Sequence, residues 1–196
     1  MPRTAIQNAA LRSATRERLL AAAMRRFAAD GFDATSVRAI ATDAGVATGL
    51  LYAHFDSKDT LLFALFARSM QQVHGTFGDA MRAAPQPSIA VLIRAAVQAV
   101  RADVDFWRLC YAVRMQPAVV ATLGATLDGW RDAIIGSLTE LLRLNGSPQP
   151  ALDALALFAQ IDGLCQHFAI QPTTYPVDDA ADRVIARWTM ARPEAW

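Results

Sequence analysis

A glycine at position 45 separates two short segments whose apolar residues recur at helical spacing, and this arrangement limits the fold more than any other feature. Thr35 suits the N-cap of the first helix. Gly45 can take the positive φ at which a helix stops, so a second short helix begins on a new axis at Val46. Residues 35–58 are therefore predicted to form a helix-turn-helix.

Helix signals also flank this unit. Before it, residues 15–30 place apolar side chains on one face and predict a helix, with residues 1–14 as a mobile arm. After it, Ser57 can cap a long helix that begins near Lys58 and runs to about residue 83. A segment with two prolines, residues 84–87, then ends that helix.

The rest of the chain has the composition of a helical protein. Alanine and leucine are abundant, and no segment sustains the period-two alternation of a strand. Prolines and glycines divide the remainder into helical segments near 88–102, 105–115, 117–144, 149–169 and 178–191. The predicted fold is all-α with about nine helices. A three-helix domain occupies residues 1–57 and a larger helical bundle residues 58–196.

Composition excludes several classes of protein. With 54% hydrophobic residues the chain is not disordered, yet its apolar stretches are too interrupted to span a membrane. Cys110 and Cys165 are too few for a metal cluster, and no secretory apolar segment precedes residue 30, which predicts a reduced, cytoplasmic protein. Net charge is only +1, so charge alone is weak evidence for a polyanionic partner.

Several short elements follow one another in fixed order: Asp30-Gly31-Phe32, Thr35 to Ala41, Ala44-Gly45-Val46, Leu51 to Phe55, and Ser57-Lys58. Together they make the stretch from about Thr15 to Leu62, roughly a quarter of the chain, resemble the N-terminal DNA-binding domain of the TetR family of bacterial transcriptional regulators. One departure is Ala47. The family often has serine there, so one phosphate-contacting hydroxyl is absent.

The resemblance implies binding to double-stranded operator DNA, with the second helix of the helix-turn-helix in the major groove. The candidate contacts are Thr35, Arg38, Ala47, Thr48, Gly49, Tyr52, His54 and Lys58. Structural roles are the alternatives: Thr35 as a cap alone, and Arg38 as a solvated cation. Lys58 is poorly placed for its own helix dipole, and a bound phosphate would explain its position. Arg3 and Arg12 could enter a minor groove or belong to a mobile tail.

The C-terminal region mixes apolar and aromatic residues with a few polar ones, as ligand cavities do. The candidate pocket residues are Phe106, Trp107, Cys110, Tyr111, Arg114, Met115, Trp130, Phe158, Cys165 and His167. The alternative is plain core packing. The resemblance implies a small-molecule effector, largely apolar and moderate in size.

Small residues four apart in segment 149–169 allow close helix approach. The resemblance implies that the last two large helices pair with those of a second subunit. The candidate interface residues are Leu155, Ala159, Gly163, Val184 and Trp188. Packing within one chain is the alternative.

Together these expectations describe a homodimeric repressor that binds an inverted-repeat operator and is released from it by a small effector. Two alternatives remain open. One is a TetR-like DNA binder whose bundle serves protein partners or activation without an inducer, and the other is a helical small-molecule carrier or enzyme. The sequence shows no nucleophile elbow, phosphate loop or His-Glu metal helix, so no catalysis, cofactor or metal is expected.

Overall fold

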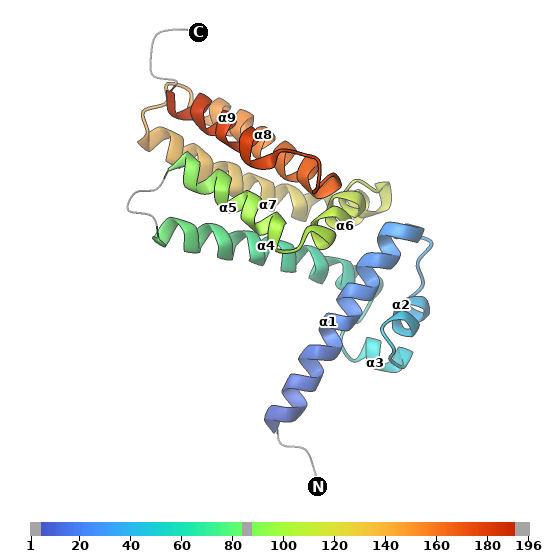
Figure 1. Ribbon diagram of the computed structural model, residues 1–196. Helices are drawn as coiled ribbons and strands as arrows, with labels where there is room; N and C mark the ends of the chain where they lie inside the picture. Colours follow the sequence, from blue (N-terminus) through green and yellow to red (C-terminus); the bar gives the residue numbers. More distant parts are fainter. Residues whose placement is uncertain (1–4, 84–87, 191–196) are drawn as a thin grey trace. The chain divides into compact units, whose positions relative to one another are not determined.

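A computed structural model of the chain describes residues 5–83 and 88–190. These residues form nine helices and no strand, which confirms the predicted all-α class (Figure 1). The helices are α1 Ala5–Asp30, α2 Val37–Asp43, α3 Thr48–Tyr52, α4 Lys58–Ala83, α5 Ile89–Ala102, α6 Val104–Arg114, α7 Pro117–Leu144, α8 Pro150–Ile170 and α9 Val177–Met190.

The first helix is longer than predicted. α1 begins at Ala5, so most of the expected mobile arm is helical and Arg12 lies inside a helix. The added turns are solvent-exposed from Ile6 to Ala14, so they show no apolar face that periodicity could detect. Alanine, leucine and glutamine favour a helix there through intrinsic propensity alone. Arg3 lies outside the described residues.

Helix caps follow the predicted chemistry with one correction. The N-cap of α2 is Ser36, whose Oγ accepts a hydrogen bond from the Ala39 amide at 3.1 Å, and not Thr35 as predicted. At α4 the prediction of a Ser57 cap is confirmed. The Thr60 amide donates to Ser57 Oγ at 3.1 Å, and the Ser57 amide donates to Thr60 Oγ1 at 3.0 Å. The reciprocal pair satisfies two amides near the start of α4.

The chain divides into two compact units that do not follow a single cut in the sequence. The first contains residues up to Ser69 together with Leu109–Gly124, and the second contains Met70–Arg108 and the residues from Ala125 onward. The first unit therefore extends past the predicted boundary between residues 57 and 58. It also recruits the corner between α6 and α7 from the second half of the sequence.

The core of the first unit fixes its short helices. Its largest fully buried side chains come from α1, α2, α3, α4 and α6: Leu19, Leu20, Met24, Phe27, Ile40, Leu51, Leu61, Leu62, Leu65 and Val113. The Phe27 and Phe32 rings meet edge to face with centroids 5.1 Å apart. Because α3 has only five residues, burial of Leu51 is its main anchor.

In the second unit α5 packs against both α8 and α9 (Figure 1). Ile93 and Leu157 are fully buried there. The Trp107 indole N–H donates to the Ala99 carbonyl at 3.1 Å, and the Arg108 guanidinium donates to the Ala169 carbonyl at 2.9 Å. These two bonds tie α6 to the ends of α5 and α8. Among the described residues, no helix is both long and apolar enough to cross a membrane.

Candidate nucleic-acid interface

The turn between α2 and α3 is a Schellman motif. The Val46 amide donates to the Ala41 carbonyl and the Gly45 amide to the Thr42 carbonyl, each at 3.0 Å. Gly45 has φ 66°, as predicted from the sequence, and a Cβ there would meet no atom within 4 Å. The positive φ, and not crowding, is therefore what requires glycine at this position.

The fixed turn makes α3 present one face to solvent. Leu51 is buried on the inner face, whereas Tyr52 is 51% exposed and Ala47 and Gly49 are also exposed. Thr48 is half-buried at the first position of the helix. A short helix with small residues at its start and a phenol at its end can approach the floor and the backbone of a DNA groove.

Salt bridges set α2 against α1. The Arg26 guanidinium on α1 forms a bidentate ion pair with Asp43 at the end of α2, and it also pairs with Asp30 at 3.1 Å. The hydrogen bond with Arg26 lowers the pKa of the Asp43 carboxyl. Arg38, on the same helix as Asp43, is exposed to solvent.

Thr35 has a structural role in place of the predicted cap. Its side chain is buried, and its hydroxyl donates to the Gly31 carbonyl at 2.7 Å and lies 3.3 Å from the Arg26 carbonyl. The hydroxyl therefore points toward the end of α1 and not toward solvent. A phosphate contact by this hydroxyl would require those bonds to break.

Lys58 also bonds to the protein itself. Its ammonium donates to the carbonyls of Phe32, Asp33 and Thr35 at 2.7, 3.2 and 3.2 Å, and it lies 4.4 Å from the centre of the Phe32 ring. An ammonium has three donors, so all of them are used here. In the free protein these carbonyls account for a lysine in the first turn of α4.

Sequence reasoning missed Gln116, which lies between α6 and α7. Its side-chain amide donates to the Phe27 carbonyl, and its amide oxygen accepts from the Phe32 amide, both at 2.8 Å. The α1–α2 turn, residues 31–36, is thus held by three side chains. Thr35 comes from the turn itself, Lys58 from α4 and Gln116 from the α6–α7 corner. The sequence signalled Gln116 only as the residue before a helix-starting proline.

The end of α3 lies beside α1. His54 is half-buried, and burial first, then the charges of Arg12 and Arg16, lower its pKa. Arg12 Nη2 lies 3.4 Å from the Ala53 carbonyl, and the Arg16 guanidinium sits 5.2 Å from the centre of the Phe55 ring. The sequence did not predict that Arg12 and Arg16 lie beside α3. Arg12 had been assigned to a mobile arm.

The ten predicted pocket residues do not form one group. Five are buried: Phe106, Trp107, Cys110, Tyr111 and Cys165. Arg114, Trp130 and Phe158 are half-buried. Met115, at 71% exposed, and His167 lie on the surface, where the His167 ring stacks with Tyr175 at 5.6 Å. The stretch Cys110–Met115 belongs to the first compact unit, whereas the other predicted residues belong to the second.

Both cysteines are buried and free. Burial, with a smaller effect of the nearby Asp162 carboxylate, raises the pKa of the Cys165 thiol to about 12. The thiol is therefore protonated at neutral pH, and protonated buried thiols are poor nucleophiles.

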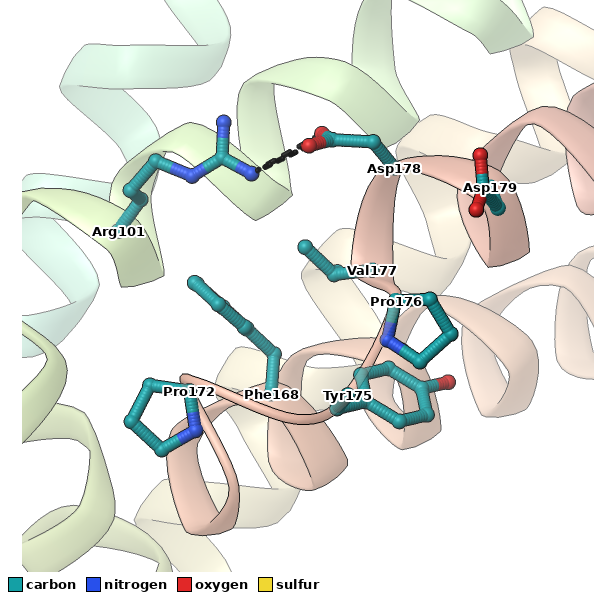
Figure 2. Close-up of a pocket in the computed structure, with 8 residues that line it drawn as sticks. All are labelled: Arg101, Phe168, Pro172, Tyr175, Pro176, Val177, Asp178 and Asp179. Atoms are coloured by element: carbon teal, nitrogen blue, oxygen red, sulfur yellow. Dashed lines mark hydrogen bonds and ion pairs between the residues drawn. The ribbon is translucent and has the colours of Figure 1, made fainter.

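A recess of about 490 Å³ opens in the second unit, where α5 ends near the α8–α9 connection (Figure 2). Its lining residues are Arg101, Phe168, Pro172, Tyr175, Pro176, Val177, Asp178 and Asp179, none of which is among the ten predicted pocket residues. Figure 2 shows the Arg101 guanidinium paired with Asp178, at 2.9 Å, and its carbon Cζ lies 5.5 Å from the centre of the Phe168 ring. The Arg101 guanidinium and the Asp178 carboxylate of the recess therefore already neutralise each other.

The predicted interface residues lie on α8 and α9. Leu155 is 51% exposed and Ala159 is exposed, while Gly163 and Val184 are half-buried. A Cβ at Gly163 would meet no atom within 4 Å. Trp188 is half-buried, and its indole N–H donates to Gln160 on α8 at 2.9 Å. The residues described contain no cluster of three or more potential metal ligands.

Two known protein-family domains together match most of the chain. The family described as bacterial regulatory proteins, tetR family, matches residues 19–65. The tetracyclin repressor-like C-terminal domain matches residues 84–191, more than half of the chain. YerO of Bacillus subtilis (strain 168), an uncharacterized HTH-type transcriptional regulator, is 41% identical over 49 residues, which are 25% of this chain and 17% of YerO. The chain thus spans less than a fifth of the length of that curated relative.

Solved structures share the fold along nearly the whole chain. A TetR-like transcriptional regulator from Rhodococcus sp. RHA1 is 26% identical, with a TM-score of 0.71 over 97% of each chain. NalD, the secondary repressor of the MexAB-OprM multidrug efflux pump in Pseudomonas aeruginosa, is 22% identical, with a TM-score of 0.67 over 93% of this chain and 98% of NalD. At that identity the likeness to NalD speaks for the fold alone.

Proposed function

Since the chain belongs to the TetR family of DNA-binding transcriptional regulators, we propose that it is a homodimeric repressor released from an inverted-repeat operator by a small, largely apolar effector. The proposal places the protein in the cytoplasm, where such an operator is found. The observation that carries it is α3: a Schellman turn and the buried Leu51 fix this helix while its other face is exposed.

The proposed DNA contacts come from α2, from α3 and from the residues at either end of α3. Arg38, Ala47, Gly49 and Tyr52 are exposed, and Thr48 and His54 are half-buried. Small side chains at the start of α3 let its backbone approach base edges, and the Ala47 methyl suits a thymine methyl. Tyr52 and His54 have polar tips suited to phosphate oxygens. We assign Thr35 and Lys58 to support of the α1–α2 turn in the free protein.

Dimerisation and effector release are further parts of the proposal. The exposed face of α8 supports a second copy as partner, because two symmetry-related reading helices can bind an inverted repeat. An effector can weaken operator binding only by binding more tightly to an arrangement of the protein that does not bind DNA. NalD, which shares the fold, is by its name a repressor, and this agrees with the sign proposed here.

A second candidate is a DNA-binding regulator whose second unit binds a protein partner and has no inducer. It is favoured by the neighbours of the predicted pocket residues. Trp107 bonds to Ala99, and the Arg114 guanidinium lies 4.5 Å from the centre of the Tyr111 ring. Such packing suits a core more than a ligand cavity. Thermal-shift screening of small apolar compounds separates the two, since a bound effector raises the Tm.

The first experiment measures DNA binding by fluorescence anisotropy. The purified protein is titrated against DNA from its own upstream region at two salt concentrations, with a scrambled duplex as the control. We expect specific, salt-dependent binding. Equal binding to both duplexes, with operator candidates from the rest of the genome also negative, would reject the proposal.

A matched pair of variants tests the interface. Tyr52→Phe removes a phenol oxygen proposed to contact phosphate, whereas Tyr175→Phe removes one in the second unit. A hydrogen bond to a charged group contributes about 1.5–3 kcal/mol, so Tyr52→Phe should weaken operator binding roughly tenfold or more. Tyr175→Phe should leave operator affinity unchanged. Equal effects of the two variants would count against the assignment of Tyr52.

A further inference from the structure

The first half of α1 carries two cations beside the reading helix. Arg12 and Arg16 are four residues apart, so they lie on the same face of α1. Both are exposed. Arg12 reaches the carbonyl of Ala53, the residue that caps the end of α3, and Arg16 covers the Phe55 ring just beyond it. This face of α1 therefore borders the end of α3, next to Tyr52 and His54.

These cations have no acidic partner in the part of the chain that the structure describes. Two other arginines of the first unit are neutralised: Arg26 pairs with Asp43 and Asp30, and Arg68 pairs at 2.7 Å with Glu17. Glu17 follows Arg16 directly in sequence, yet its carboxylate pairs with Arg68 on α4. The charges of Arg12 and Arg16 are also close enough to His54 to disfavour its protonated form.

The like charges of Arg12 and Arg16 on one face of α1 repel each other. Two cations at positions i and i+4 of a helix destabilise it slightly, and no carboxylate offsets this among the described residues. The cost is recovered when an anion binds between or beside them. Because arginine forks match phosphate oxygens and the cluster borders α3, the anion that fits is the DNA backbone.

We propose that Arg12 and Arg16 extend the DNA interface onto α1, where each contacts a phosphate next to the bases that face α3. The inference rests on the proposed function, because it assumes that α3 meets DNA. It differs from a minor-groove arm in that the two side chains project from a formed helix. Such contacts position the protein on the duplex and carry no sequence information.

The test compares Arg12→Gln and Arg16→Gln with Arg131→Gln as control. Arg131 is an exposed arginine on α7 in the second unit, already paired with Asp128 and Asp132. The affinity of each variant for operator and for scrambled duplex is measured over a range of salt concentrations. Urea midpoints show whether each variant is folded as stably as the wild type.

The expected result is the same fold-loss of affinity for both duplexes, with the control unchanged. The slope of log affinity against log salt should flatten by about 0.9 for each phosphate that the variant no longer neutralises, or about 1.8 per substitution in a dimer. Arg12→Lys and Arg16→Lys, which keep the charge, should retain most of the slope. Unchanged affinity and slope in both glutamine variants, with wild type binding its operator, would overturn this inference and leave the proposed function standing. No DNA binding by wild type would overturn the proposed function itself.

Discussion

At the scale of single residues, hydrogen-bond donors decide what a charged side chain does. Lys58 is half-buried, and three backbone carbonyls lie within reach of its ammonium. The ammonium donates a hydrogen bond to each of them and so holds the α1–α2 turn. Thr35 does the same with one hydroxyl. Both residues match the pattern that suggested DNA contact. In the free protein both stabilise the turn that leads into α2.

Replacement of Lys58 by methionine should therefore destabilise the protein in the absence of DNA. The three carbonyls would lose their donor, and a loss of about 1–2 kcal/mol in the free energy of unfolding is expected for a partly exposed group. Urea denaturation followed by circular dichroism measures it. Arg38→Met removes a cation from an exposed position of the same unit and should change stability by no more than about 0.5 kcal/mol.

Equal stability of the two variants would show that the Lys58 bonds contribute nothing to folding. In that case a reduced operator affinity of Lys58→Met would return the residue to the phosphate contact expected from the sequence. The stability of the free protein and its operator affinity together separate the two roles.

The residue scale also shows the reach of sequence reasoning. Gly45 and Ser57 were predicted correctly, because positive φ and capping depend on neighbours within a few residues. The choice between the adjacent hydroxyls of Thr35 and Ser36 was wrong. Both residues suit an N-cap, and burial of Thr35 under the end of α1 decides between them.

At the scale of elements, helix existence was predictable and contacts between distant helices were not. The Ser57 cap and the prolines and glycines that follow gave the limits of α4 and α7. The extra turns of α1 were missed because they have propensity without a buried face. Gln116 was missed because its partners Phe27 and Phe32 are 89 and 84 residues away in sequence. No local pattern marks such a pairing.

The two Gln116 hydrogen bonds link the α6–α7 corner to the end of α1 and the α1–α2 turn. Gln116→Met keeps the side-chain length but loses both 2.8 Å bonds, leaving the Phe27 carbonyl and the Phe32 amide without that partner. We expect a loss of about 1–3 kcal/mol in unfolding free energy and weaker operator binding. The measurements are urea denaturation and fluorescence anisotropy.

Gln98→Met is the matched control for this element. Gln98 lies exposed on α5 in the second unit, so the same chemical change should alter neither quantity there. If Gln116→Met behaves like Gln98→Met, the two bonds do not hold the α1–α2 turn.

At the scale of the whole molecule, the two compact units share helices. α4, α6 and α7 each contribute residues to both units, so the chain is continuous through three helices where the sequence suggested one link. The predicted division at residues 57 and 58 followed the DNA-binding motif. The units follow packing, which brings Leu109–Gly124 to the first one. The proposed effector release would use these shared helices, since each of them is a continuous piece of chain that contributes residues to both units.

The proposed dimer gives the last prediction. Leu152 and Leu155 on α8 are 60% and 51% exposed, which favours a partner over solvent at this face. Leu155→Arg adds a charge where the second copy would pack, so the variant should sediment as a monomer while the wild type sediments as a dimer. Since Leu155 is exposed within one chain, the variant should keep its helical circular dichroism.

Val120→Arg is the control, because Val120 is also 51% exposed but lies on α7 in the first unit. It should remain dimeric. A monomer presents one reading helix and engages one half-site, so Leu155→Arg should also lose most of its affinity for an inverted repeat while its affinity for a single half-site is retained. A dimeric Leu155→Arg protein would remove Leu155 from the proposed interface. A monomeric wild type would reject the proposed dimer and leave operator recognition to a single α3 helix.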